Sequence, residues 1–379
     1  MKTILVIGGY GNFGKRLVMS LLQYYSVKLI VAGRSLEKAQ QFQVHVQTQL
    51  SKKIEVIRLD VLHDDLTQVF EQIRPFIVIN ASGPYQTQRN TSNNYYVAQA
   101  CVKAGCHYID LADDRVFVSE FAHNLNDRAV AANVMLVTGA STVPGLTGAV
   151  VDYFKENFAK INTLNYGISP GNKTERGRAT VGSILSYTGR PFLTKKEGEL
   201  VTIHGWQGLS RYDFGEPLGK RWMSYCDIPD LTLLPERYPQ IQTIIFKAGL
   251  EVTLLHLGLW FLAGFSRIRL IKNWRFATGF LTWLSERFIA WGSDAGGMFI
   301  ELHGQTMNGE NKTLVWQLVA ENGVGPNVPT IAAELIVKKI LEGKIKLGAM
   351  PCLGLFELEE FFAVAKRWNI FQRVESKKS

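Results

Sequence analysis

Cysteine is scarce in this chain, and its few thiols do not form a recognisable framework. Cys101, Cys106, Cys226 and Cys352 have neither the paired spacing of a zinc site nor the dense pattern of a disulfide-rich secreted domain. We therefore predict no metal site, and free thiols in a reducing cytosol. A signal-peptide pattern is also lacking, because a predicted core strand begins at Thr3. These absences together favour a cytoplasmic protein.

Acidic residues are outnumbered by basic ones, which leaves an excess of positive charge. The 379 residues include 42 Lys and Arg against 33 Asp and Glu, and the formal net charge is +9. Such a balance favours anionic ligands or membrane surfaces. It does not indicate nucleic acid, because the basic residues are scattered and we find no nucleic-acid-binding motif. Internal repeats and low-complexity segments are also lacking, and the length predicts two globular domains.

The N-terminus contains a strand, a glycine-rich turn and a helix in direct succession. Thr3 to Ile7 is an aliphatic run typical of a strand buried on both faces, and Lys15 to Tyr25 has apolar residues at helical spacing. Between them, Gly9, Gly11 and Gly14 match G-x-G-x-x-G. Such glycines allow the tight turn, the approach of a pyrophosphate and the close packing of helix on strand. The helix N-terminus then attracts the phosphates.

The end of the next predicted strand indicates which dinucleotide binds. At the place where NAD-binding proteins usually carry Asp or Glu for the ribose 2′-hydroxyl, this chain has Gly33, Arg34 and Ser35. The guanidinium of Arg34 can pair with a 2′-phosphate, and the hydroxyl of Ser35 can donate to it. We therefore predict NADP as the cofactor. The predicted cofactor contacts are Gly9, Tyr10, Gly11, Asn12, Phe13, Gly14, Arg34, Ser35, Asp60, Ser82 and Gly83.

Strand and helix patterns continue to alternate through the first 158 residues. The later strands are short and mostly aliphatic, and are predicted at 54–59, 76–81, 106–111 and 134–138. The helical patterns between and after them are longer, and are predicted at 36–50, 91–104, 116–133 and 146–158. Six strands with right-handed crossovers predict an α/β fold in which 1–150 form a doubly wound parallel Rossmann sheet. Asp60 then faces the adenine side of the cofactor or caps the following helix.

Residues 151–325 are predicted to form a second, mixed α+β substrate domain. Thr163 to Ser169 alternates like a strand. Met298 to Gln305 and Thr313 to Ala320 flank an Asn308-Gly309 dipeptide, which is typical of a hairpin turn. We expect these segments to form a second sheet.

Five motifs occur in a fixed order along the first 145 residues. They are GGYGNFG at 8–14, AGRS at 32–35, NASGPY at 80–85, HYIDLADD at 107–114 and GASTVPG at 139–145. In this order and spacing the set resembles the saccharopine dehydrogenase-like (saccharopine reductase-like) oxidoreductases. The resemblance is good over the N-terminal 150 residues, weak over the middle and moderate at the C-terminal helix. It implies an NADP-binding Rossmann domain, a substrate domain, and helices in 326–379 that return to the first domain.

Hydride transfer needs a proton donor or acceptor beside the nicotinamide, and the candidates are Tyr85, Asp110 and Asp113. Each has an alternative role, because Tyr85 can simply pack and the two aspartates can cap the next helix. The family resemblance implies chemistry on an amino-acid-derived imine, whereas the apolar middle domain favours a small apolar carbonyl, imine or alkene. Short-chain dehydrogenases need Tyr-x-x-x-Lys on a helix after the fourth or fifth strand, beside the nicotinamide. Here the motif occurs only at Tyr24 to Lys28, at the end of the first predicted helix, so this class is excluded. The alternative function is a non-catalytic NADP-binding sensor or partner-binding module.

The most unusual stretch is an apolar helical hairpin predicted at 248–291. Ala248 to Phe265 is almost wholly apolar, but Glu251 and His256 interrupt it, and a spanning helix needs about 20 apolar residues. Phe276 to Trp291 then places aromatic residues at helical spacing. One interpretation is peripheral contact with the inner face of a membrane, with basic residues toward anionic headgroups. The other is burial in a domain interface or a homodimer interface. We also expect the tail, 375–379, to be frayed.

Overall fold

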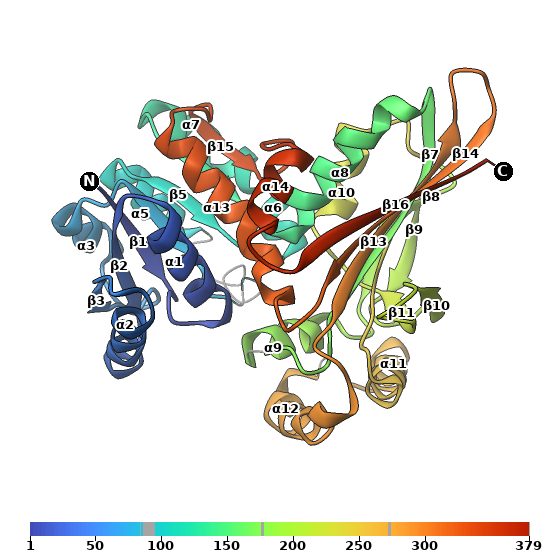
Figure 1. The fold of residues 1–379 in the computed structure, drawn as a ribbon, viewed down its shortest axis with the longest axis horizontal. Coiled ribbons are helices and arrows are strands. Elements are labelled where there is room, and N and C mark those ends of the chain that lie inside the picture. The colour runs from blue at the N-terminus through green and yellow to red at the C-terminus, as the bar shows by residue number, and fades with distance from the viewer. Residues whose placement is uncertain (84, 86–94, 176–177, 272–273, 379) are drawn as a thin grey trace. The chain divides into compact units, whose positions relative to one another are not determined.

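The computed structural model describes residues 1–379 apart from 84, 86–94, 176–177, 272–273 and 379 (Figure 1). The chain divides into two compact units. Unit 1 comprises Met1–Leu146 and Asn327–Phe356, and unit 2 comprises Thr147–Pro326 and Glu357–Ser379. We expected the helices of 326–379 to return to the first domain. The segment is instead divided, with Asn327–Phe356 in unit 1 and Glu357–Ser379 in unit 2.

Unit 1 is built on a parallel sheet. In its described part, seven strands occur in the order β15-β6-β5-β4-β1-β2-β3. Their bounds are β1 Lys2–Ile7, β2 Val27–Gly33, β3 Glu55–Arg58, β4 Ile77–Asn80, β5 His107–Asp110, β6 Met135–Thr138 and β15 Gly348–Pro351. The six predicted strands and the doubly wound α/β fold are confirmed. The seventh strand, β15, was not predicted, because its GAMP sequence is too short and too weakly apolar to show a pattern.

Helices flank this sheet, and most begin or end at residues with a clear local cause. Their bounds are α1 Asn12–Tyr24, α2 Leu36–Leu50, α3 Leu66–Ile73, α5 Tyr96–Ala104, α6 Arg115–Ser119, α7 Phe121–Ala131, η1 Thr142–Leu146 and α13 Val328–Leu341. Asp65 caps α3 by accepting from the N–H of Gln68, and Gly105 ends α5 at a φ of +66°. The helix predicted at 116–133 is wrong as one element, because α6 and α7 meet at Glu120. The first residues of the helix predicted at 91–104, 91–94, lie outside the described residues.

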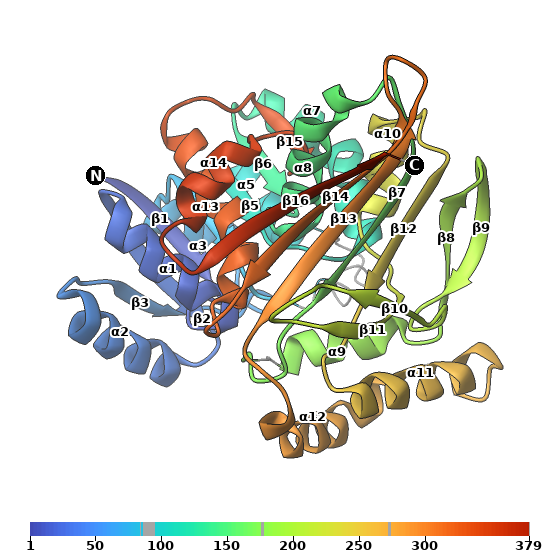
Figure 2. The same ribbon diagram turned by 45° about the vertical axis from the view of Figure 1, so that its right-hand side comes forward.

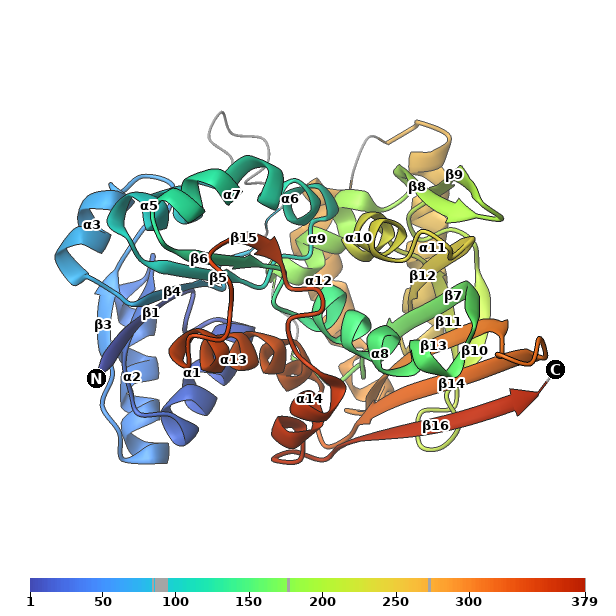
Figure 3. The ribbon, with the colours of Figure 1, turned by 90° about the horizontal axis from the view of Figure 1, so that it is seen from above.

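Helix α13 shows how the late segment of the chain joins unit 1. It lies beside α1 (Figures 1 and 3), and the Ser20 hydroxyl donates to a carboxylate oxygen of Glu334 at 2.5 Å. Glu334 is 1% exposed, and the apolar residues on either side of it in α13 are also buried. A buried carboxylate needs such a partner, because an unpaired one is costly in an apolar interior. The contact therefore fixes the position of α13 on α1.

Unit 2 is built on a mixed sheet, as expected for a second sheet. Its described strands occur in the order β10-β11-β12-β7-β13-β14-β16, and a separate hairpin pairs β8 with β9. Their bounds are β7 Lys160–Ser169, β8 Pro191–Lys196, β9 Glu199–His204, β10 Ser210–Asp213, β11 Lys220–Tyr225, β12 Thr243–Ala248, β13 Gly296–Gln305, β14 Asn311–Ala320 and β16 Ile370–Lys378. The predicted β13–β14 hairpin is confirmed, and Gly309 in its turn has a φ of +80°.

The predicted fraying of the tail is wrong as far as Lys378. Strand β16 pairs antiparallel with β14, from Ile370 opposite Ala320 to Lys378 opposite Lys312. The polar composition of the tail suggested a loose end, but β16 is the edge of its sheet, and charged residues are common on edge strands. The backbone pairing therefore stabilises a segment whose sequence has little apolar character.

The described helices of unit 2 are short, and α11 is the longest with 15 residues (Figure 2). Their bounds are α8 Thr147–Phe154, η2 Lys155–Asn157, α9 Arg178–Tyr187, α10 Asp230–Arg237, α11 Thr253–Arg267, η3 Arg275–Ala277, α12 Thr278–Arg287, η4 Ile289–Trp291, η5 Gly325–Asn327 and α14 Leu358–Ala365. Within the described ranges, every helix is too short or too polar to cross a bilayer.

Asp230, at the start of α10, carries a buried carboxyl group. Burial is the larger effect and raises its pKa from 3.8 to about 7, although the hydroxyls of Thr147 and Tyr166 act in the opposite direction. A carboxyl group whose pKa is raised by folding stabilises the fold fully below its ordinary pKa. This contribution is lost as the pH rises through the folded-state pKa.

Replacing Asp230 by Asn is therefore expected to raise the apparent melting temperature by several degrees at pH 8, and to change it little near pH 4. The neutral amide resembles the protonated acid, so the difference from wild type should grow between about pH 4 and pH 7. Thermal unfolding followed by circular dichroism across pH 4–8 measures this. Asp213→Asn, at an exposed position of unit 2, is the control. Equal pH profiles for wild type and Asp230→Asn would contradict the prediction.

Candidate functional site

The glycine-rich turn between β1 and α1 has no space for side chains. Gly8 has a φ of +73°, a conformation that side-chain-bearing residues rarely adopt. A Cβ atom built on Gly14 would lie 2.2 Å from the carbonyl oxygen of Gly8, and one on Gly9 would lie 3.0 Å from Val31. The turn therefore needs glycine at these positions, and its backbone is open to close approach by a ligand.

The start of α1 fits a phosphate group. Gly11 is the residue before the first helical turn, and it has no side chain that could cap the helix. In the described structure, the first turn of α1 contains no acidic residue. The N–H groups and the positive end of the helix dipole are therefore not opposed by a local negative charge. The residues present fit the pyrophosphate of a dinucleotide.

Tyr10 connects this turn to the end of β2. Its hydroxyl oxygen accepts from the backbone N–H of Ser35 at 3.0 Å. A Cβ atom on Gly33 would lie 2.5 Å from the same hydroxyl, so only glycine allows the ring to pack there. We predicted Tyr10 as a cofactor contact from the motif but did not foresee this link. Its sequence signal is the combination of an aromatic residue in the first turn with glycine at the end of the second strand.

Arg34 and Ser35 follow β2, at the position that the sequence predicts to select the cofactor. The side chain of Arg34 is exposed. The hydroxyl of Ser35 accepts from the N–H of Lys38 at 3.3 Å and so caps α2. A serine hydroxyl that accepts one hydrogen bond still has its own proton to donate. Both groups therefore keep the hydrogen-bonding capacity that a 2′-phosphate needs.

Asp60 follows β3, at the same edge of the sheet. Its carboxylate accepts from the N–H of Leu62 at 3.1 Å and lies 3.1 Å from Nδ1 of His63. These two bonds hold its pKa below the ordinary value, and the positive charge of Arg34 contributes to a smaller extent. Asp60 therefore closes its own turn. The helix cap considered for it is supplied by Asp65, and its place on the adenine side of the cofactor stays a prediction.

Ser82 and Gly83 follow β4, whose carboxyl end lies beside that of β1. Both the N–H and the hydroxyl of Ser82 donate to Oδ1 of Asn80, at 3.1 and 2.5 Å. Gly83 is exposed, and residue 84 lies outside the described residues. Asn80 therefore shapes the turn that the sequence predicted to face the cofactor.

Tyr85 is buried and its hydroxyl is occupied. It is 4% exposed, donates to the carbonyl oxygen of Asn80 at 2.6 Å, and accepts from the N–H of Leu111 at 3.4 Å. Burial raises the pKa of this phenol well above its ordinary value. In this conformation Tyr85 joins the turn after β4 to the turn after β5.

The two candidate aspartates differ in exposure. Oδ1 of Asp110 is completely buried and accepts from the N–H of Ala112, the hydroxyl of Thr138 and the N–H of Gly139, at 2.8–2.9 Å. Burial raises its pKa to about 6 in spite of these bonds. Asp110 thereby joins the ends of β5 and β6. Asp113 is exposed, and the helix cap that we considered for either aspartate is supplied by Asp114.

A family model for the saccharopine dehydrogenase NADP binding domain matches residues 4–137. This range contains the glycine turn, Arg34 and the ends of β3, β4 and β5 described above. This part of the chain is therefore similar to that NADP-binding domain. The cofactor is NADP, in agreement with the prediction from Arg34 and Ser35.

Solved structures agree with this assignment at the level of the fold. Apo histidine-tagged saccharopine dehydrogenase (L-Glu forming) from Saccharomyces cerevisiae matches with a TM-score of 0.68 and 15% identity, over 100% of both chains. At this identity the likeness shows the fold alone. A meso-dapdh mutant with DAP from Clostridium tetani covers 95% of this chain and 96% of its own, with 13% identity and a TM-score of 0.48. That score is too low to support an argument. No curated protein matches the chain in sequence.

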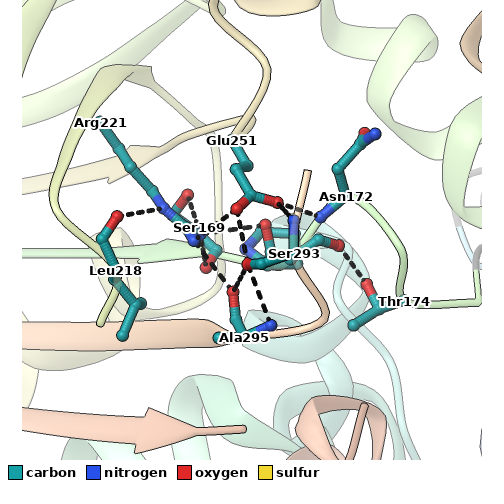
Figure 4. A network of polar contacts seen from close by, with 10 residues as sticks. Ser169, Asn172, Thr174, Leu218, Arg221, Glu251, Ser293 and Ala295 are labelled. Carbon is teal, nitrogen blue, oxygen red and sulfur yellow. Dashed lines mark hydrogen bonds and ion pairs between the residues drawn. The ribbon is translucent and has the colours of Figure 1, made fainter. Parts of the chain in front are cut away.

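Unit 2 contains a polar network that the sequence did not reveal (Figure 4). Arg221 of β11 is 2% exposed, and Nη2 donates to Oε1 of Glu251 at 3.2 Å and to the carbonyl oxygen of Ala295 at 2.9 Å. Its Nη1 donates to the carbonyl oxygens of Ser169 and Pro170, at 3.0 and 3.2 Å. The guanidinium therefore joins β11 to three other segments that are far apart in the sequence.

Glu251 completes this network. Its Oε2 accepts from the N–H groups of Asn172 and Ser293, at 2.6 and 2.9 Å, and its Oε1 accepts from the Ser293 hydroxyl at 2.6 Å. Because Glu251 lies just before α11 and Ser293 just before β13, the carboxylate holds both ends of the segment that contains α11 and α12. A residue that interrupted an apolar run in the sequence is thus an anchor in the structure.

Proposed function

We propose that this protein is an NADP-dependent oxidoreductase that transfers a hydride to or from a small carbonyl, imine or alkene substrate. The observation that carries the proposal is the glycine turn at the start of α1. It excludes side chains and offers uncapped N–H groups within a saccharopine dehydrogenase NADP-binding domain. Bound NADP supplies the hydride chemistry. The residues of this chain bind the cofactor, orient it and move a proton.

The proposed roles follow from the contacts of each residue. Gly9 to Gly14 and the start of α1 hold the pyrophosphate, and Arg34 and Ser35 hold the 2′-phosphate. Tyr10 joins the glycine turn to the loop after β2 through the hydrogen bond from Ser35. Asp113 is the exposed candidate for contact with substrate, and so for the proton transfer.

Tyr85 and Asp110 remain in the proposal as positioning residues. Their bonds hold the turns that follow β4 and β5, and the second of these turns carries Asp113. A raised pKa of about 6 also places Asp110 where a carboxyl group can exchange a proton near neutral pH. Because Asp110 is completely buried, we propose that it acts through the groups that donate hydrogen bonds to it and does not contact the substrate.

We also propose that the substrate is apolar. The support is the composition of unit 2, where α11 and α12 expose large apolar side chains. A soluble amino acid with several carboxylates would instead need clustered basic groups.

The test is the transfer of deuterium from NADPH labelled at either position of nicotinamide C4 to a panel of apolar aldehydes, ketones, imines and enones. We expect label in the product from one of the two NADPH isomers, detected by mass spectrometry, because a protein site presents one face of the ring. NADPH binding without transfer to any member of the panel would contradict the enzyme. It would favour a non-catalytic NADP sensor, which the occupied Tyr85 hydroxyl and the buried Asp110 also fit.

A further inference from the structure

Helix α11 is apolar on the side that faces the protein and also on the side that faces away from it. The inward side carries Leu259 and Ala263, which pack with Leu185 of α9 and with Trp206. The opposite side is made of large apolar residues at a spacing of three or four: Leu254, Leu257, Phe261, Phe265 and Ile268. Phe261 is 60% exposed. A helix that is apolar all round is normally covered on all sides, so the outer side of α11 lacks an expected cover.

Helix α12 and its flanking turns continue this apolar surface. Phe276, Phe280 and Trp291 are 77%, 61% and 67% exposed, and Phe280 stacks with Trp283. Ring contacts also connect α11 with η3, the turn before α12, from Phe261 to Phe265, then to Trp274 and to Phe276. Figure 2 shows α11 and α12 along the same edge of unit 2. We call the exposed apolar residues at 254–291 the α11–α12 face.

The two polar residues that interrupt the apolar sequence of this region, Glu251 and His256, point inward, away from the face. Glu251 belongs to the Arg221 network. His256 is completely buried: Nδ1 accepts from the N–H of Leu250 at 3.2 Å, and Nε2 lies 3.0 Å from the Ser224 hydroxyl. Burial lowers its pKa to about 4, so the ring is neutral at physiological pH. The outer surface of α11 is therefore more continuously apolar than the sequence suggests.

Positive charges border the α11–α12 face. Residues 252–291 contain one acidic residue, Glu286, and five basic residues. Four of the basic residues lie in the described part and are exposed: Arg267, Arg269, Arg275 and Arg287. The guanidinium of Arg287 lies 4.9 Å from the ring of Trp283. Aromatic residues beside arginines suit the boundary between acyl chains and anionic headgroups.

We propose that the α11–α12 face docks on an anionic lipid bilayer, with both helices lying in the headgroup region. Helix α11 has 15 residues, about 22 Å of helix, which is shorter than the roughly 30 Å hydrocarbon core. It therefore lies on the bilayer and does not cross it. The Arg221–Glu251 network supports this geometry, because it holds both ends of the segment on the sheet of unit 2.

Charge favours a bilayer over a second copy of this chain. A twofold dimer through this face would bring the same patch together from both copies. Among the described residues, each copy would contribute four exposed arginines and one acidic residue, so like charges would oppose each other. Anionic lipids, in contrast, attract about 1 kcal/mol per basic residue near the surface. The docking does not depend on catalysis and goes beyond the proposed function.

The test is cosedimentation of the full chain with vesicles of phosphatidylcholine alone or with 30% phosphatidylglycerol. We expect binding to the anionic vesicles, weakened at least tenfold by Phe261→Ser with Phe280→Ser. Arg267→Gln with Arg275→Gln should also weaken it and reduce its dependence on salt. Leu200→Ser is the matched control, because Leu200 is 66% exposed on the β8–β9 hairpin, and it should bind like wild type.

Three results would overturn the docking proposal. The first is that wild type does not bind anionic vesicles, and the second is that the Phe261/Phe280 variant binds them as well as wild type does. The third is a wild-type dimer in sedimentation velocity that does not bind vesicles and that the same variant dissociates. Circular dichroism melts check that the variants are folded. NADPH titration of the same samples separates this outcome from the proposed function, because cofactor binding involves unit 1 residues and does not need the vesicles.

Discussion

Replacing Arg34 by Ala is expected to remove the preference for NADPH over NADH, with NADPH binding weakened about 10–100-fold and NADH binding nearly unchanged. The reason is that the exposed guanidinium is the predicted partner of the 2′-phosphate, and a charge-assisted hydrogen bond contributes about 1.5–3 kcal/mol. A neutral ribose hydroxyl gains little from it. Fluorescence titration of wild type and Arg34→Ala with both nucleotides measures the change.

Gly14→Ala provides the contrast for this experiment. Its Cβ would meet the carbonyl oxygen of Gly8 at 2.2 Å, so the turn must move and both nucleotides should bind weakly. A comparable loss of NADH and NADPH in Arg34→Ala would mean that the arginine acts on the pyrophosphate or on the fold. Unchanged NADPH binding would contradict the assignment of Arg34 to the 2′-phosphate.

Replacing Arg221 by Met is expected to destabilise unit 2 by about 3–5 kcal/mol, the range seen when one partner of a buried ion pair is removed. Glu251, 17% exposed, would keep its charge without its guanidinium partner. The carbonyl oxygens of Ser169, Pro170 and Ala295 would also each lose a donor. Thermal and urea unfolding, followed by circular dichroism, should show a melting temperature lower by about 6 °C or more.

Lys220→Met is the matched control for Arg221→Met. It makes the same kind of substitution one residue away on β11, but the Lys220 side chain is 68% exposed and its pair with Asp213 is 3.9 Å long. An exposed ion pair of this kind contributes little. The double variant Arg221→Met/Glu251→Gln should lose less stability than the sum of the two single variants, because the charge left behind is gone. Additive losses would show that the two residues act independently.

The sequence was sufficient for the features that depend on local patterns. Six strands of unit 1, the glycine turn, the choice of NADP and the β13–β14 hairpin follow from aliphatic runs, glycine spacing, Arg34 and an Asn-Gly turn. Each of these is decided by residues close together in the chain. The same holds for α2, whose N-cap at Ser35 and end at Leu50 match the predicted range.

The sequence was insufficient where pairing with a distant segment decides the structure. Strand β15 exists because β6 offers a parallel edge more than 200 residues earlier, and β16 exists because β14 accepts a polar strand at the sheet edge. The candidate catalytic residues show the same limit. Tyr85 and Asp110 looked accessible at strand ends, but the neighbouring turns bury them.

Local patterns in the sequence were enough to predict an NADP-binding Rossmann unit and an unusually apolar segment at 248–291. The side of that segment that faces outward depends on contacts with distant strands, which the sequence does not show. In the sequence, Glu251 and His256 interrupt an apolar run. In the structure, both point inward and interact with Arg221 and Ser224, respectively. The physical reason is that buried polar groups must find partners, and those partners lie on strands that the local sequence does not reveal.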